Sequence, residues 1–126
     1  MATIVIAEDE YLLAIDMAES LEGDGHEVLM APDGSLALNL VRERRPQLVI
    51  TDFMMPVMTG LELAKAIHVE YPEAGIPIVL VSGAHFELAR KHSEYFAEII
   101  CKPCSKRLLL EAVARLLAEV RPSSTF

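Results

Sequence analysis

Short apolar runs alternate with amphipathic segments along the chain, and this alternation restricts the possible folds more than any other feature. Five runs of apolar and β-branched residues have the length of strands: residues 3–7, 26–31, 48–51, 77–81 and 99–102. Continuous apolar runs of this length are typical of parallel strands that are buried on both faces.

The segments between the runs carry apolar residues at the spacing of a helix face. The four stripes are Leu13, Ala14, Met17, Ala18 and Leu21; Ala37, Leu40 and Val41; Leu63, Ala64, Ile67 and Tyr71; and Leu109, Ala112, Val113, Leu116, Leu117 and Val120. A glycine or a proline follows each stripe, as is common where helices end. Residues 86–97 are the weakest helix candidate, because charged and polar side chains leave few apolar anchors there.

Five strand–helix repeats predict a doubly wound α/β fold with right-handed crossovers. The chain has 126 residues, the usual size of one domain with one sizeable core. No linker or internal repeat interrupts the pattern. We therefore expect a single domain over residues 1–121 and a short tail over residues 122–126.

Composition argues against several classes of protein. The net charge is −8, from 19 acidic and 11 basic residues, which disfavours direct binding to nucleic acid. No apolar run approaches the roughly 20 residues that span a bilayer, and the N-terminus lacks the basic region of a signal peptide. Two cysteines are too few for a disulfide-rich scaffold. We expect a cytoplasmic protein with reduced thiols and no membrane contact.

Polar side chains follow four of the five apolar runs, at the point where each predicted strand ends. Glu8 and Asp9 follow the first run, Asp52 the third, Ser82 the fourth, and Lys102 ends the fifth. Ligands of open α/β sheets bind beyond the carboxyl ends of the strands. The sequence therefore predicts that three carboxylates, one hydroxyl and one ammonium meet at one edge of the sheet.

This set of groups fits the transfer of a phosphoryl group. Clustered carboxylates repel one another unless a cation lies between them, and Mg²⁺ prefers carboxylate oxygens and water as ligands. A carboxylate beside Mg²⁺ can act as a nucleophile toward phosphorus and form an aspartyl phosphate. The phosphoryl oxygens then need a metal, a hydroxyl donor and an ammonium as partners.

Each of these residues also has an ordinary structural explanation. Glu8 and Asp9 suit the first turn of a helix, where acidic side chains favour the helix dipole. Asp52 suits a turn, Ser82 a loop, and Lys102 a solvated surface. Their joint occurrence at strand ends, in this order, favours a common site.

The chain resembles the receiver domains of response regulators in two-component signalling. The motifs that carry the resemblance are Glu8-Asp9, the string Asp-Phe-Met-Met-Pro-Val-Met-Thr-Gly that begins at Asp52, Ser82-Gly-Ala, and Lys102-Pro103. The resemblance extends from residue 3 to about residue 120, and it implies a flavodoxin-like (βα)5 sandwich with a parallel sheet in the order 2-1-3-4-5.

The resemblance also implies a role for each site residue. Asp52 would accept a phosphoryl group from a histidine kinase or a histidine phosphotransfer protein. Mg²⁺ would be held by Asp9, by Glu8 through water, by Asp52 and by the backbone carbonyl of Met54. Ser82 and Lys102 would bind the phosphoryl group, and the domain would act as a switch with weak autophosphatase activity rather than as a turnover enzyme.

The resemblance further implies how the signal leaves the domain. A downstream protein would bind the surface formed by the helix over 86–97, the strand over 99–102 and the last helix, and phosphorylation could also promote a homodimer. The family usually has Tyr or Phe three residues before the lysine, as a switch, whereas this chain has Ile99. We therefore expect displacement of the loop after Ser82, with the following helix, to carry the signal. The family also commonly has a cis peptide bond before the residue that corresponds to Pro103.

Other interpretations of the same residues remain open. Cys101 and Cys104 form a C-x-x-C motif, which is typical of thiol redox proteins, and together with His85 and His92 they could form a zinc site. Two further alternatives are a phosphatase of the haloacid dehalogenase type and a partner-binding pseudo-receiver. Met54 stands where that phosphatase needs a second aspartate, and the intact acidic and basic site residues argue against the pseudo-receiver. We expect Cys101 to be buried and Cys104 to lie near a helix N-terminus, where a thiolate is favoured.

Overall fold

Five short strands form one parallel sheet in the computed structural model, which describes residues 1–119. The strands are β1 (Thr3–Ala7), β2 (Glu27–Ala31), β3 (Leu48–Thr51), β4 (Ile78–Ser82) and β5 (Glu98–Cys101). Their order across the sheet is β2-β1-β3-β4-β5, with all neighbouring pairs parallel. The predicted flavodoxin-like fold and strand order are confirmed. No end of a strand lies more than one residue from its predicted position.

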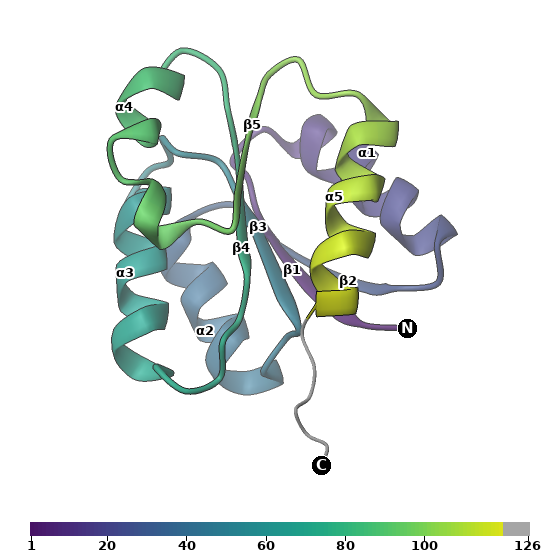
Figure 1. The fold of residues 1–126 in the computed structure, drawn as a ribbon, viewed down its shortest axis with the longest axis horizontal. Coiled ribbons are helices and arrows are strands. Elements are labelled where there is room, and N and C mark those ends of the chain that lie inside the picture. Colours follow the sequence, from purple (N-terminus) through teal and green to yellow (C-terminus); the bar gives the residue numbers. More distant parts are fainter. Residues whose placement is uncertain (120–126) are drawn as a thin grey trace.

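Helices cover both faces of the sheet (Figure 1). They are α1 (Tyr11–Gly23), α2 (Gly34–Arg44), α3 (Gly60–Glu70), α4 (Phe86–Arg90) and α5 (Lys106–Glu119), with a short 3₁₀ helix, η1 (Ser93–Tyr95). α1 and α5 lie on one face, and α2, α3 and α4 lie on the other. The last residue of the predicted final stripe, Val120, and the predicted tail over 122–126 lie outside the described residues.

Two apolar clusters fill the space between the sheet and its helices. One contains Val5, Val49 and Leu80 and packs under α2 and α3. The other contains Ile4 and Ile50 and packs under α1 and α5. Because neighbouring residues of a strand face opposite sides, a continuous apolar run supplies both clusters at once.

Side-chain caps begin three of the helices, and at the start of α5 the Ser105 hydroxyl accepts a hydrogen bond from the Leu108 N–H (3.0 Å). The Asp33 side chain accepts a hydrogen bond from the Leu36 N–H at the start of α2 (2.9 Å). At the start of α3, Thr59 and Glu62 form a reciprocal capping box. Such caps satisfy N–H groups that have no partner inside the helix.

The helix predicted over residues 86–97 is wrong in its extent. α4 ends at Arg90, and only the 3₁₀ turn of η1 follows it. The physical reason lies downstream: Phe96 is buried in the core, and the Ala97 N–H donates to the Ile78 carbonyl (2.8 Å). Residues 96 and 97 are therefore extended beside β4 and leave the helix short.

No helix within residues 1–119 combines the length and the apolar character that crossing a bilayer requires.

Candidate functional site

The carboxyl ends of the strands bring the predicted site residues together. Glu8 directly follows β1 and Asp52 directly follows β3, and these two strands pair side by side. The Asp52 N–H donates to the Ala7 carbonyl (3.0 Å), so the ladder of hydrogen bonds continues into the site. Lys102 directly follows β5, and its N–H donates to the Ser82 carbonyl at the end of β4 (2.9 Å).

Three carboxylates form a cluster at this edge of the sheet. Glu8, Asp9 and Asp52 each offer an oxygen, and the three oxygens lie within 4.8 Å of one another. Glu8 is buried, Asp52 is half-buried and Asp9 is exposed, so the cluster runs from the protein interior to the surface. The Glu8 carboxylate also accepts a hydrogen bond from the Glu10 N–H (3.1 Å), which supports the start of α1.

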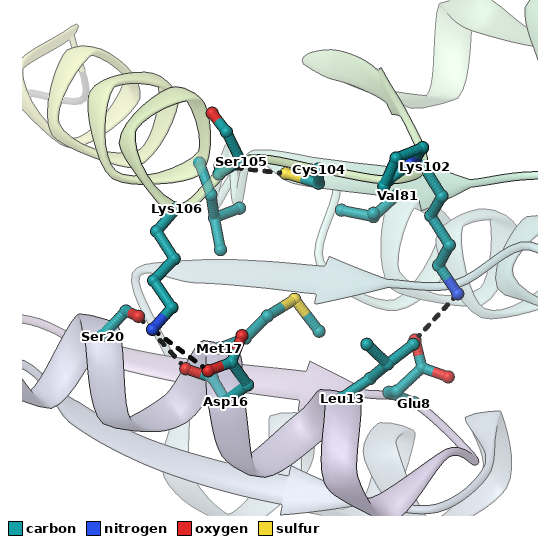
Figure 2. A pocket seen from close by; sticks show the side chains of 12 residues that line it. Glu8, Leu13, Asp16, Met17, Ser20, Val81, Lys102, Cys104, Ser105 and Lys106 are labelled. Carbon is teal, nitrogen blue, oxygen red and sulfur yellow. Dashed lines mark hydrogen bonds and ion pairs between the residues drawn. The ribbon is translucent and has the colours of Figure 1, made fainter.

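The Lys102 ammonium joins two of these carboxylates. Its Nζ lies 3.3 Å from Glu8 Oε1 and 3.3 Å from Asp52 Oδ2. Figure 2 shows the Lys102 side chain extended toward Glu8. Burial acts to lower the pKa of Lys102, but the negative charges of Asp52 and Glu8 outweigh it and raise that pKa. Lys102 therefore keeps its positive charge beside Asp52.

Burial raises the pKa of the Glu8 carboxyl above its usual value, and the charge of Asp52 adds to the rise. The hydrogen bond from the Glu10 N–H and the charge of Lys102 act in the opposite direction without cancelling it. A nearby cation would stabilise the charged form of this carboxyl and so oppose the rise in its pKa.

The cluster fits the ligand preferences of Mg²⁺. It contains only oxygen ligands, and the exposed position of Asp9 leaves room for the waters that Mg²⁺ usually keeps. Within residues 1–119, Glu8, Asp9 and Asp52 form the only group of three or more acidic, histidine or cysteine side chains close enough to share an ion.

Ser82 is the last residue of β4 and is only 2% exposed. In the described part of the chain its hydroxyl makes no hydrogen bond to another residue. A buried hydroxyl without a partner is unusual, since buried polar groups are normally hydrogen-bonded. Ser82 therefore has a free donor close to the end of the sheet.

The loop from Asp52 to Gly60 holds the candidate acceptor in place. The Phe53 N–H donates to Asp52 Oδ1 (2.7 Å), and the Gly60 N–H donates to the Phe53 carbonyl (2.8 Å). A Cβ atom at Gly60 would collide with the Asp52 carbonyl oxygen, so only glycine fits there. Val57 has a φ of 72°, a strained value for a β-branched residue. The Met54 side chain is 46% exposed.

Cys104 lies two residues before α5, near a helix N-terminus as predicted, but Cys101 is not buried as predicted. Cys101 is exposed, because β5 is an edge strand whose end is left uncovered. Burial raises the pKa of the Cys104 thiol, which disfavours the expected thiolate. By the alternation of a strand, Cys101 lies on the same face as Ile99, which packs against the cluster under α3, whereas Cys104 packs against the cluster under α5. This placement on opposite faces argues against a thioredoxin-like site.

Two features of the site are not predicted from the sequence. His85 stacks on Phe53, with ring centroids 6.0 Å apart and an interplanar angle of 25°. His85 is also the N-terminal flanking residue of α4, so this contact joins the loop of Asp52 to α4. The strained backbone of Val57 is the second feature, and neither leaves a signal in local residue patterns. The Lys102–Pro103 peptide bond is cis, as the resemblance implies.

Comparison with curated proteins finds regulators and a kinase. The uncharacterized transcriptional regulatory protein YesN of Bacillus subtilis is 30% identical over 125 residues, which cover 96% of this chain and 34% of YesN. The sensor histidine kinase TmoS of Ectopseudomonas mendocina is 34% identical over 117 residues, which cover 91% of this chain and 12% of TmoS. The chain thus spans about a third or less of these relatives.

Solved structures and a family model agree with this result. The receiver domain of NtrX from Brucella abortus matches with a TM-score of 0.85 and 29% identity, over 93% of this chain and 99% of that domain. A response regulator receiver domain protein from Clostridium thermocellum matches with a TM-score of 0.83 and 27% identity, over 94% and 95%. The family model of the response regulator receiver domain matches residues 4–114. The chain therefore belongs to the response regulator receiver domain family.

Proposed function

We propose that Asp52 accepts a phosphoryl group from a histidine kinase or a histidine phosphotransfer protein, in a reaction that requires Mg²⁺. The observation that carries this proposal is the position of Asp52 between the carboxylates of Glu8 and Asp9 and the Lys102 ammonium, whose Nζ is 3.3 Å from Asp52 Oδ2. A nucleophilic carboxylate flanked by a cation site and a fixed ammonium suits the transfer of a charged group.

The chemistry follows from the positions of these side chains. An Asp52 oxygen attacks phosphorus, and the bond from phosphorus to the donor imidazole nitrogen breaks as the new O–P bond forms. Lys102 and the free hydroxyl of Ser82 pair with the phosphoryl oxygens. Asp9, Asp52, the Met54 carbonyl and, through water, Glu8 would hold Mg²⁺, which would offset the charge of the carboxylates and the phosphoryl oxygens.

The product is a signal carried by protein contacts. The phosphoryl group carries about −1.5 to −2 charges in place of the single charge of the Asp52 carboxylate. The chain would therefore change its surface rather than turn over a substrate, apart from slow self-dephosphorylation. We propose that the target binds the surface of α4, β5 and α5, that phosphorylation can also favour a homodimer there, and that the domain comprises residues 1–121. The net charge of −8 disfavours direct nucleic-acid contact. We also propose a cytoplasmic location.

Labelling with radioactive acetyl phosphate tests the proposal. We expect the chain to incorporate phosphate with Mg²⁺ and not with EDTA, and Asp52→Asn to abolish incorporation because an amide is a poor nucleophile. Asp24→Asn is the matched control, because Asp24 lies at the far end of α1. Incorporation by Asp52→Asn at the normal rate, or equal incorporation in EDTA, would show that the proposal is wrong.

A further inference from the structure

A cleft of about 390 Å³ opens between α1 and α5, on the side of the sheet opposite α3. Its walls are mainly apolar: Leu13 and Met17 come from α1, Val81 from β4, Pro103 from the loop after β5, and Leu109 from α5. Figure 2 shows Met17 and Leu13 side by side along one wall. A volume of this size lies within the range of about 300–1,000 Å³ that small-molecule sites have.

An ion pair lies at each end of the cleft. Lys106 Nζ is 3.3 Å from Asp16 Oδ1 at the outer end, and Lys102 Nζ is 3.3 Å from Glu8 Oε1 at the inner end. In Figure 2 the two pairs stand on opposite sides of Met17 and Leu13. A trough that is bounded at both ends suits a compact molecule better than an extended peptide, which would have to continue past the charged ends.

The charges of the lining select an uncharged occupant. The two lysines and the two carboxylates cancel, so a charged ligand would have to compete with an existing ion pair. Two hydroxyls at the rim keep hydrogen-bonding capacity. Ser20 Oγ donates to the Asp16 carbonyl and can still accept, and Ser105 Oγ accepts from the Leu108 N–H and can still donate.

We propose that this cleft binds a small, uncharged, apolar molecule that carries one hydrogen-bonding group. Its apolar body would cover Leu13, which is 38% exposed, together with Met17, and its polar group would reach the hydroxyls at the rim. Most of the binding free energy would come from removing these apolar surfaces from water.

Binding in the cleft would also affect the phosphorylation site. Lys102 and Glu8 line the inner end of the cleft and belong to the candidate site. An occupant would restrict the Lys102 side chain, and coupling between two sites is reciprocal. The coupling between the cleft and the phosphorylation site rests on the proposed function, whereas the binding of a small molecule in the cleft does not.

Titration of the protein with three naphthalene probes tests the binding, with methyl NMR signals as the readout. The probes are naphthalene-2-methanol, naphthalene-2-carboxylate and naphthalene-2-methylammonium, which differ mainly in charge. We expect the neutral alcohol to shift the methyl signals of Leu13, Met17, Val81 and Leu109. The signals of Leu38, which packs on the other face of the sheet, should stay in place. The two charged probes should bind at least tenfold more weakly.

Two neighbouring leucines provide a matched pair of variants. Leu13→Glu places a charge in the cleft and should weaken binding of the alcohol at least tenfold. Leu12→Glu changes a side chain that is 80% exposed and does not line the cleft, so affinity should be unchanged. If Leu13→Glu fails to fold, Ser20→Trp keeps the test valid, because it adds bulk at the rim without a charge and should also weaken binding.

Three results would overturn the proposal. The first is a shift pattern outside the cleft, the second is equal affinity of the two glutamate variants, and the third is tightest binding of a charged probe. The titration uses neither Mg²⁺ nor a phosphoryl donor. Binding without phosphate incorporation would therefore refute the proposed function alone, and incorporation without binding would refute the cleft proposal alone.

Discussion

Met54 stands two residues after Asp52, and its exposed thioether has no donor and is only a weak acceptor, so it orients a water molecule poorly. Ala84, two residues after Ser82, cannot orient one by hydrogen bonding. We therefore expect the phosphorylated form to lose its phosphate slowly, and Met54→Asn to speed this loss roughly tenfold, or about 1.4 kcal/mol in the barrier. The measurement is the decay of radioactive label after removal of the donor.

Val57→Asn is the control for this variant. It puts the same amide into the same loop, five residues after Asp52, and asparagine tolerates the left-handed backbone found there. Its decay rate should equal that of the original chain. An unchanged or slower decay in Met54→Asn would contradict the role assigned to residue 54.

The two thiols should differ in reactivity. Cys101 is exposed, whereas Cys104 is partly buried and burial raises its thiol pKa. A raised pKa leaves less thiolate at a given pH, and the thiolate is the reactive form. At pH 8 we expect iodoacetamide to modify Cys101 several times faster than Cys104, with the Cys104 rate rising as the pH increases further. Peptide mass spectrometry gives both rates.

The single variants Cys101→Ser and Cys104→Ser assign the two rates. The double variant should keep its phosphate incorporation, since neither thiol contacts Asp52. Faster modification of Cys104, or loss of incorporation only under oxidising conditions, would instead support a role for the pair in redox control.

At the scale of elements, α4 is the least anchored of the α-helices that cover the sheet. It has five residues, one buried side chain (Ala89) and no side-chain cap. α3 has eleven residues, four buried residues and a complete capping box. Segments with few buried contacts open at low free-energy cost, so α4 is the element most able to shift when its neighbours change.

Amide hydrogen exchange with Mg²⁺ and beryllofluoride, a phosphoryl mimic, tests this difference. We expect protection to change mainly within residues 82–104, because this segment contains Ser82 and Lys102 and because His85 within it stacks on Phe53. Amides of α3 should change little, and Asp52→Asn should show no response. Changes confined to other elements would mean that the signal leaves by another route.

Local patterns predict the strands well, because an apolar run depends only on its own residues. The end of α4 is different: it depends on Phe96 entering a core built by α2 and α3, and on the Ala97 N–H pairing with β4. The exposure of Cys101 likewise depends on what covers an edge strand. Both features depend on tertiary contacts, so the spacing of apolar residues in the sequence does not predict them.

At the scale of the whole molecule, the candidate site is predictable for the same reason as the fold. Strand ends of a parallel sheet share one edge, so residues as distant in sequence as Glu8 and Asp52 are expected to meet once the alternation is recognised. The stacking of His85 on Phe53 could not be predicted, because it requires the path of the loop after β4. The sequence therefore predicts which polar side chains meet at the sheet edge, whereas contacts such as the stacking of His85 on Phe53 depend on tertiary packing.

The ion pair between Glu8 and Lys102 joins residues that are 94 positions apart. During synthesis Glu8 joins the chain directly after β1, whereas Lys102 joins it only after all five strands have been made. Until β5 has been made and has joined the sheet, Glu8 and Asp52 lack their ammonium partner. A nascent chain without β5 therefore lacks the complete candidate site, and if the proposed function holds we expect it not to accept a phosphoryl group.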